Sequence, residues 1–256
     1  MNAAALPPGY VRSTRGSTVL VARDWAADVL AQALAAHGSL YQWAAAQPAL
    51  EALRGRGVTW AATLAAGAGA QAATPVVVRH SRHGGMFARI TGDLFPRPTR
   101  APRELATAVR LAGAGVPTPE VVAYTVHPVA GLLARSDVMT RRLPPGLDFP
   151  DAWRAAASDP ARDAVLQAVA VLLRALSTAG AHHPDLNVKN IYVTSEATPV
   201  ACVLDVDRVR FADDALAAAG NFARLARSVR KWQALHGLTV GDAELVRLAS
   251  LAWVDA

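Results

Sequence analysis

Residues 182–190 read HHPDLNVKN, and residues 205–207, a short way along the chain, read DVD. Before the first stretch, residues 161–178 place apolar side chains at helical spacing, which predicts a long amphipathic helix. After it, β-branched runs at 190–194 and 200–205 predict two short strands. The order is therefore helix, polar loop, strand, turn, strand and acidic triplet.

The polar loop and the triplet carry side chains that suit phosphate chemistry. Asn190 follows Asp185 by five residues, the spacing of the Asp and Asn in the protein-kinase catalytic loop, and Asp205 ends the second strand. Each residue alone has an ordinary role, because Asp and Asn form turns and caps and a lone His often bonds a buried carbonyl. The ordered combination is what predicts phosphoryl transfer.

Phosphoryl transfer needs an acceptor hydroxyl in line with the γ-phosphate of ATP, and a divalent metal to offset the charge on the phosphate oxygens. Asp185 would accept the hydrogen bond from that hydroxyl, and His183 would brace the loop. Mg²⁺ usually takes one or two protein carboxylates together with phosphate oxygens. Asn190 and Asp205 are therefore the predicted metal ligands.

Composition narrows the class of protein less sharply. The chain has 256 residues, of which 52% are hydrophobic, enough to bury one sizeable core or two small lobes. Lys and Arg number 26 against 20 Asp and Glu, which gives a formal net charge of +6. This balance fits nucleic acid, an anionic membrane surface or an acidic substrate as partner, and it also fits a basic solvated surface.

No apolar stretch reaches the roughly 20 residues of a lipid-spanning helix, and residues 1–10 lack the pattern of a secretion signal. We therefore expect a cytoplasmic protein. Cys202 is the only cysteine, so a single chain can form neither an intrachain disulfide nor a thiolate metal cluster. Its apolar neighbours predict buried packing.

The remaining elements follow from the same periodicities and from breaks at Pro and Gly. We predict a strand at residues 17–21, helices at 25–37 and 40–53, a hairpin from 58–64 and 75–79, a helix at 102–114, extended segments at 120–126 and 132–140, and helices at 214–236 and 242–253. These elements predict an α+β chain that divides near residue 142 into a small β-rich lobe and a mainly helical lobe.

Several separated segments resemble the bacterial 3-deoxy-D-manno-octulosonic acid (Kdo) kinases of the lipopolysaccharide kinase family. Besides the loop and the triplet, these are GRGVTW at 55–60, VRHSRHGG at 78–85, RE at 103–104, GVPTP at 115–119, MTRRL at 139–143 and NFARLARS at 221–228. The resemblance implies a two-lobed protein-kinase-like fold, with a nucleotide-binding lobe in residues 1–142 and a catalytic, acceptor-binding lobe in 143–256. It implies ATP and Mg²⁺ as cofactors.

The resemblance also assigns roles to five residues of the first lobe. Gly55 and Gly57 resemble the loop over the ATP phosphates, where backbone N–H groups approach oxygen. Arg79 takes the place of the phosphate-binding lysine, and Glu104 that of its ion-pair partner. An arginine binds phosphate bidentately but is not equivalent to a compact ammonium. Met139 begins the segment that resembles the hinge, whose backbone would bind adenine.

The implied acceptor is the 4-hydroxyl of Kdo in the lipopolysaccharide inner core or a Kdo–lipid A precursor of a Gram-negative bacterium. The short stretch 208–213 leaves no room for a long activation segment, which disfavours a protein substrate. Two basic groups are candidates for acceptor binding, with a merely solvated surface as the alternative: His80, Arg82 and His83 after one strand, and Arg224, Arg227 and Lys231 on one helix face.

A lipid-linked acceptor implies peripheral attraction to the cytoplasmic face of the inner membrane, and no obligate protein partner is inferred. Three other functions stay open: a heptose-directed core kinase, a soluble small-molecule phosphotransferase with the same Asp, Asn and Asp, and a catalytically silent kinase-like binding module, suggested by Arg79 and Pro184. Nucleic-acid binding is disfavoured, because no aromatics interleave with basic strands and no recognition helix or zinc motif is present.

Overall fold

The computed structural model describes residues 5–48, 51–53, 58–65, 72–82 and 92–253. The chain forms two compact units. Unit 1 contains Met1–Ala106 and Glu120–Arg142, and unit 2 contains Thr107–Pro119 and Leu143–Ala256.

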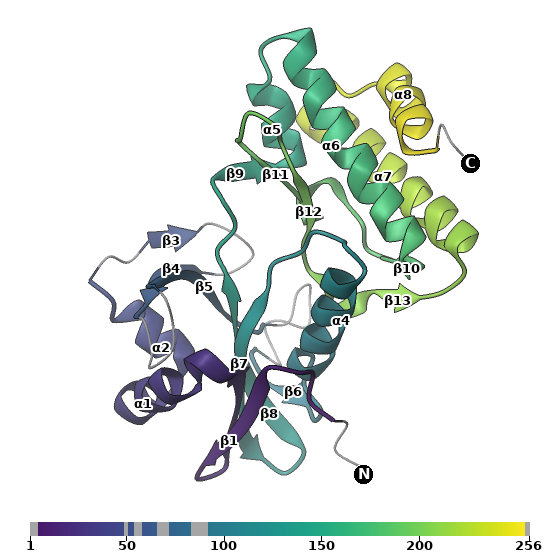
Figure 1. Ribbon diagram of the computed structural model, residues 1–256. Coiled ribbons are helices and arrows are strands. Elements are labelled where there is room, and N and C mark those ends of the chain that lie inside the picture. Colours follow the sequence, from purple (N-terminus) through teal and green to yellow (C-terminus); the bar gives the residue numbers. More distant parts are fainter. Residues whose placement is uncertain (1–4, 49–50, 54–57, 66–71, 83–91, 254–256) are drawn as a thin grey trace. The chain divides into compact units, whose positions relative to one another are not determined.

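Unit 1 is built on an antiparallel sheet with the strand order β1-β2-β7-β8-β5-β4-β3, and β6 adds to β8 (Figure 1). The strands are β1 Tyr10–Arg15, β2 Thr18–Arg23, β3 Glu51–Leu53, β4 Thr59–Leu64, β5 Thr74–His80, β6 Phe95–Pro96, β7 Val121–Ala130 and β8 Leu133–Arg141. The predicted hairpin is confirmed, because β4 and β5 pair from Thr59 with Arg79 to Leu64 with Thr74. β1 was not predicted, since all its side chains after Tyr10 are exposed and leave no apolar alternation.

The core of unit 1 lies where helices α1 Ala27–His37 and α2 Leu40–Ala45 meet the sheet, after the short helix η1 Asp24–Ala26. Fully buried side chains from both layers interlock there, among them Leu30, Leu40, Val76, Val78 and Met139. The prediction of one helix over 40–53 is wrong, because α2 ends at Ala45 and residues 51–53 form β3. Pro48 explains the stop, since proline disfavours helical backbone before it.

Helix α4, Ala101–Gly113, confirms the helix predicted at 102–114. Its buried apolar positions include Leu105, Ala108 and Leu111, at helical spacing. Residues 114–119 then run to the sheet of unit 2, where the Val203 N–H donates to the Pro117 carbonyl over 2.9 Å.

Unit 2 is mainly helical, with small antiparallel sheets β9–β11–β12 and β10–β13. Its elements are β9 Gly146–Asp148, α5 Phe149–Ala155, α6 Asp159–Thr178, β10 Ala181–His182, η2 Val188–Asn190, β11 Ile191–Thr194, β12 Ala201–Val203, η3 Val206–Arg208, β13 Arg210–Phe211, α7 Asp214–His236 and α8 Asp242–Trp253. The three long helices and the strand pair after the polar loop were all predicted. Within the described part of the chain, no helix is long and apolar enough to cross a membrane.

Cys202 lies in β12 and is buried, as predicted. Burial raises the pKa of its thiol to about 11, so the thiolate is disfavoured at neutral pH. Cys202 is therefore a packing residue rather than a reactive one.

Candidate active site

The loop between α6 and β11 is held in place by side chains of helix α7. Asn221, which is 1% exposed, accepts a hydrogen bond from the His183 N–H and donates one to the Ala181 carbonyl, both over 2.8 Å. Two helical turns further along α7, the Ser228 hydroxyl accepts a hydrogen bond from the Val188 N–H over 3.1 Å. Because residues three, four and seven apart share a helix face, one face of α7 fixes the loop at both ends.

His183 is fully buried within this loop. Its Nδ1 accepts from the Asp185 N–H and its Nε2 donates to the Leu204 carbonyl, each over 3.2 Å. A backbone N–H can only donate and a carbonyl can only accept, so these bonds select the neutral Nε2–H tautomer. Burial lowers the pKa of His183, which favours the same neutral form. His183 thus braces Asp185 against the strand end that precedes Asp205.

Asp185 faces an arginine of α7. Its Oδ1 accepts from Nη2 of Arg224 over 2.7 Å, and Nε of Arg224 donates to the Pro184 carbonyl over 3.2 Å. Partial burial raises the pKa of Asp185, but the hydrogen bond and charge of Arg224 outweigh it, so this pKa lies below its usual value. Asp185 is therefore ionised at neutral pH, and among the described residues no hydrogen bond engages its Oδ2.

Strand pairing places Asn190 beside Asp205. β11 and β12 pair Ile191 with Val203, and the Leu204 N–H donates to the Asn190 carbonyl over 2.8 Å. The Asn190 amide nitrogen donates to the Asp185 carbonyl over 3.0 Å, which leaves its amide oxygen as an acceptor. Asp205 is exposed, and its φ of 58° is the one left-handed value of a non-glycine residue in the described chain. Such backbone strain is often found at functional sites.

The side chains of Asn190 and Asp205 provide the type and the number of oxygen ligands that Mg²⁺ takes from a protein. No group of three or more His, Cys, Asp or Glu suited to a metal occurs among residues that the structure describes. An amide and a carboxylate oxygen are the smaller set that Mg²⁺ takes when phosphate oxygens and water complete its shell. The pair Asn190 and Asp205 therefore suits a metal that arrives with a nucleotide.

In unit 1, Arg79 at the end of β5 and Glu104 in the first turn of α4 form an ion pair. Glu104 is 7% exposed, whereas about a third of the Arg79 side chain is accessible. A buried carboxylate thus orients an arginine that keeps part of its guanidinium at the surface. Its role toward phosphate stays a prediction.

His80 differs from the expectation of an acceptor-binding residue. Its Nδ1 lies 2.6 Å from Oδ1 of Asp137 and its Nε2 lies 3.0 Å from Oδ2 of Asp93, so both nitrogens are engaged within unit 1. The hydrogen bond with Asp137 is the main cause that raises the pKa of His80. His80 is thus a charged structural residue, because two carboxylates already occupy its donors.

Asp137, one of the two carboxylates that contact His80, is buried and has no exposed surface. Burial raises its pKa, but hydrogen bonds from His127, His80 and the Tyr41 N–H more than compensate and lower that pKa to about 2. The network therefore holds a carboxylate charge inside the first unit, opposite His80 in the pairing of β5 with β8.

Met139, the first residue of the segment expected to form the hinge, lies in a strand. It lies inside β8, is fully buried, and pairs with Val78 on one side and Ala123 on the other. Strand β8 runs on to Arg141, and the hinge role of this segment stays a prediction.

The other predicted residues divide by exposure. Arg82, Arg227 and Lys231 are exposed, as an acceptor-binding role requires. Gly55, Gly57 and His83 lie outside the described residues.

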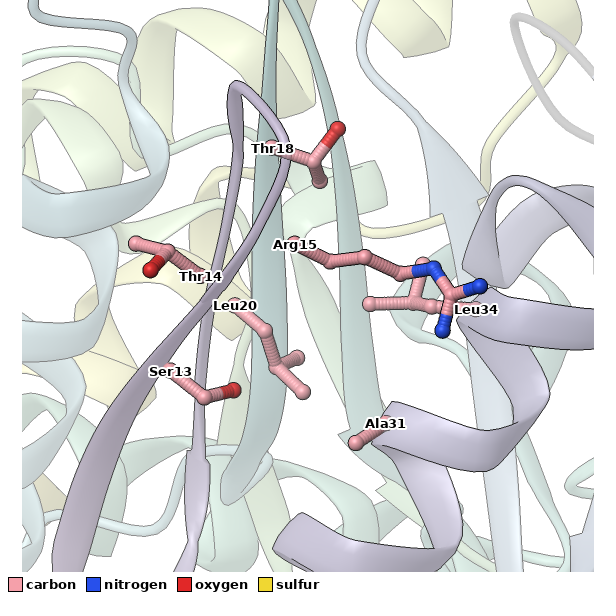
Figure 2. Close-up of a pocket in the computed structure, with 7 residues that line it drawn as sticks. All are labelled: Ser13, Thr14, Arg15, Thr18, Leu20, Ala31 and Leu34. Atoms are coloured by element: carbon pink, nitrogen blue, oxygen red, sulfur yellow. The ribbon is translucent and has the colours of Figure 1, made fainter.

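Two surface pockets lie apart from all these residues. One, of about 190 Å³, lies between hairpin β1–β2 and helix α1 (Figure 2) and is lined by Ser13, Thr14, Arg15, Thr18, Leu20, Ala31 and Leu34. A second, of about 490 Å³, is lined by residues of α5, α6 and α8 and by Thr239. Neither is lined by a predicted site residue.

The chain has a kinase-like two-lobed α+β fold, with Asp185 and Asn190 in one loop and Asp205 after strand β12, and its class is a phosphotransferase that acts on a hydroxyl group. Residues 41–247 match the lipopolysaccharide kinase (Kdo/WaaP) family, and the chain belongs to that family. It is thus a lipopolysaccharide core kinase, and kinases of this family use ATP.

Relatives agree with this assignment. The chain is 27% identical over 188 residues to the 3-deoxy-D-manno-octulosonic acid kinase of Vibrio cholerae serotype O1, covering 72% of this chain and 74% of the relative. It is 30% identical over 187 residues to the kinase of the same name from Photobacterium profundum, covering 70% and 72%. Among solved structures, WaaP in complex with acyl carrier protein aligns with a TM-score of 0.50 at 19% identity, over 81% of this chain and 80% of that one, which supports the fold.

Proposed function

We propose that this chain transfers the γ-phosphate of ATP, with Mg²⁺, to the 4-hydroxyl of Kdo in the lipopolysaccharide inner core or a Kdo–lipid A precursor. The observation that carries the proposal is the ionised Asp185, which is fixed by His183 and Arg224 with one oxygen open. The sugar follows from relatives that are named 3-deoxy-D-manno-octulosonic acid kinases.

In this mechanism Asp185 accepts the hydrogen bond of the acceptor hydroxyl through Oδ2, while Arg224 holds Oδ1. A carboxylate of lowered pKa is a weak base, so its main contribution is to orient the nucleophile. This suffices for phosphoryl transfer, because its loose transition state depends on positioning and electrostatic stabilisation. As the new bond from the acceptor oxygen to the γ-phosphorus forms, the bond from that phosphorus to the β,γ-bridging oxygen breaks and ADP leaves, while the hydroxyl proton passes to Asp185.

Residues proposed for the nucleotide and its metal are taken from each unit separately. Asn190 and Asp205 would hold Mg²⁺, which offsets charge on the phosphate oxygens when bound. Arg79, oriented by Glu104, would contact phosphate in place of a lysine. Leu143 follows β8 and has a backbone N–H that bonds no described residue, which suits it to adenine better than Met139.

The proposed division of labour gives nucleotide binding to residues 1–142 and catalysis with acceptor binding to 143–256. Arg82, Arg227 and Lys231 are exposed cations for the acidic acceptor. An acceptor anchored in lipid places the enzyme peripherally at the cytoplasmic face of the inner membrane, where anionic lipid attracts its net charge of +6.

A test of the acceptor uses γ-labelled ATP, Mg²⁺ and three substrates: Kdo–lipid A precursor, a heptosylated core and the deacylated Kdo saccharide. We expect label on both Kdo-ending acceptors, with phosphorus–proton correlation in the NMR spectrum at position 4 of Kdo. Label that appears only on heptose would replace the proposal with a heptose-directed kinase. No transfer by folded, ATP-binding protein would refute the substrate class.

A further inference from the structure

Two hairpins of unit 1 end side by side. Val19 of β2 pairs with Val126 of β7, so the turn of β1–β2 and the turn of β7–β8 lie at the same end of the sheet (Figure 1). β6 flanks them, because Pro96 pairs with Leu133. We call these two turns, at residues 16–17 and 131–132, together with residues 97–100 after β6, the hairpin end.

The hairpin end exposes large apolar side chains. Leu132 is 78% exposed, Val129 46% and Leu133 38%, all within five consecutive positions. The backbone causes this exposure: Gly131, at φ 52°, allows a tight turn that puts Leu132 at the tip, and a register shift between Pro128 and Ala130 leaves Val129 unpaired. Single exposed aliphatics are common, but a cluster at a projecting tip indicates an interaction surface.

The same surface carries positive charge and lacks acidic residues of its own. The hairpin tips at residues 14–19 and 128–133 and residues 97–100 after β6 contain no Asp or Glu. Arg15 and Arg97 are exposed, and the Arg97 N–H donates to the Leu132 carbonyl over 2.8 Å, which places it beside the tip. Figure 2 shows Arg15 extending from its hairpin toward Leu34 of α1.

The nearest acid in sequence to β6 is Asp93, and cations already bind it. Its Oδ2 lies 3.0 Å from His80 Nε2 and 2.7 Å from Arg135 Nε. The hairpin end therefore presents arginines around an apolar tip, with the adjacent carboxylate neutralised within the fold.

We propose that the hairpin end docks on an anionic lipid bilayer, with Leu132 and Val129 at the depth of the headgroup boundary and Arg15 and Arg97 against lipid phosphates. The inference rests on the peripheral membrane location proposed above and names the surface responsible. Interfacial binding combines a small buried apolar area with basic residues, as this surface does. A stable protein interface needs about 800 Å² from each partner, more than one projecting turn supplies.

The test is co-sedimentation of the full chain with vesicles of phosphatidylcholine alone and with added phosphatidylglycerol. We expect binding to the anionic vesicles only, weakened by salt. Leu132→Ser should reduce the partition coefficient about tenfold or more, because the lost burial of a leucine is of that size. Arg15→Gln with Arg97→Gln should reduce it roughly 25-fold, since each arginine near the surface contributes about fivefold.

Matched controls lie on unit 2. Leu216→Ser removes a leucine that is 69% exposed on α7, and Arg230→Gln with Arg247→Gln removes two exposed charges. Both should bind vesicles like wild type. Equal losses in controls and hairpin variants, or hairpin variants that bind like wild type, would overturn the inference. Binding to soluble polyglutamate but not to vesicles would assign the surface to an acidic protein instead and would also overturn it.

Transfer to the deacylated Kdo saccharide, measured in parallel, separates this inference from the proposed function. Hairpin variants should phosphorylate it at the wild-type rate and lose activity only toward acceptor embedded in vesicles. If wild type binds vesicles as expected but never phosphorylates the saccharide, the docking surface stands and the proposed function fails.

Discussion

His183 and His80 are both shielded histidines next to residues of the candidate site, yet their surroundings give them opposite charge states. His183 bonds two backbone groups in unit 2, and burial lowers its pKa, so it is neutral. His80 lies between Asp137 and Asp93 in unit 1, so both ring nitrogens face carboxylate oxygens and its pKa is raised, which favours the imidazolium form. The partners that tertiary structure supplies, and not the residue type, decide whether such a histidine braces a loop or neutralises a carboxylate.

The largest effect is expected in the loop that contains neutral His183. There Arg224 is the cation that holds Asp185, and its substitution is the strongest test. Arg224→Gln should lower kcat about tenfold to a hundredfold, because a catalytic group displaced by about 1 Å loses activity of that order. The pKa of Asp185 should rise, so the acid limb of the kcat–pH profile should move to higher pH. Arg224→Lys should recover part of both effects.

Arg230→Gln, on the same helix and paired with exposed Asp242, is the matched control and should leave kcat and its pH profile unchanged. A purely structural role for Arg224 would lower activity at every pH without moving the acid limb. That outcome would contradict the assignment of Arg224 as the positioning residue of Asp185.

The His80 site is tested through the free energy of unfolding. Asp137→Asn should reduce the free energy of unfolding by about 3 kcal/mol, because it leaves the His80 charge without its buried partner. Urea denaturation, followed by the signal of a probe in unit 1 such as Trp43 fluorescence, measures this change. The matched variant Asp163→Asn removes an exposed carboxylate and should cost less than 1 kcal/mol.

The two histidines should also give opposite dependences of stability on pH. The raised pKa of His80 contributes stability that is complete below the ordinary histidine pKa and is lost as pH rises through the folded value. The lowered pKa of His183 contributes stability that is complete above the ordinary value and is lost as pH falls toward the folded one.

His80→Gln should therefore flatten the alkaline side of the stability curve, and His183→Gln the acidic side, as chemical denaturation from pH 5 to pH 9 would measure. Nitrogen-15 NMR of the imidazoles provides the direct check. A protonated His183 or a neutral His80 at pH 6.5 would remove the contrast between the two sites.

Much of the fold could be predicted because its long helices carry local signals. α6, α7 and α8 have apolar faces at helical spacing, and α6 and α7 begin at the side-chain caps Ser158 and Asp213. The failures have local causes too. Pro48 ends a helix early, and β1 is an exposed edge strand without alternation.

The candidate site was predictable in its chemistry and not in its supports. The order and spacing of Asp185, Asn190 and Asp205 along the chain predict their roles, and the structure adds which side chains hold them. The clamp of Asn221, Arg224 and Ser228 was missed, although their spacing already places them on one face of α7. The sequence does not show what a helix face contacts. Arg224 was therefore predicted to bind the acceptor, whereas in the structure it pairs with Asp185.

The most direct test of Asp185 as the catalytic residue is single-turnover transfer of the ATP γ-phosphate to the Kdo saccharide by Asp185→Asn, with Asp163→Asn as the charge-matched control. We expect a loss of about 10²- to 10⁴-fold in the Asp185 variant, the range for a positioned acid–base group, and wild-type transfer in the control. Transfer by Asp185→Asn at the wild-type rate would contradict the assignment of this loop as the catalytic site.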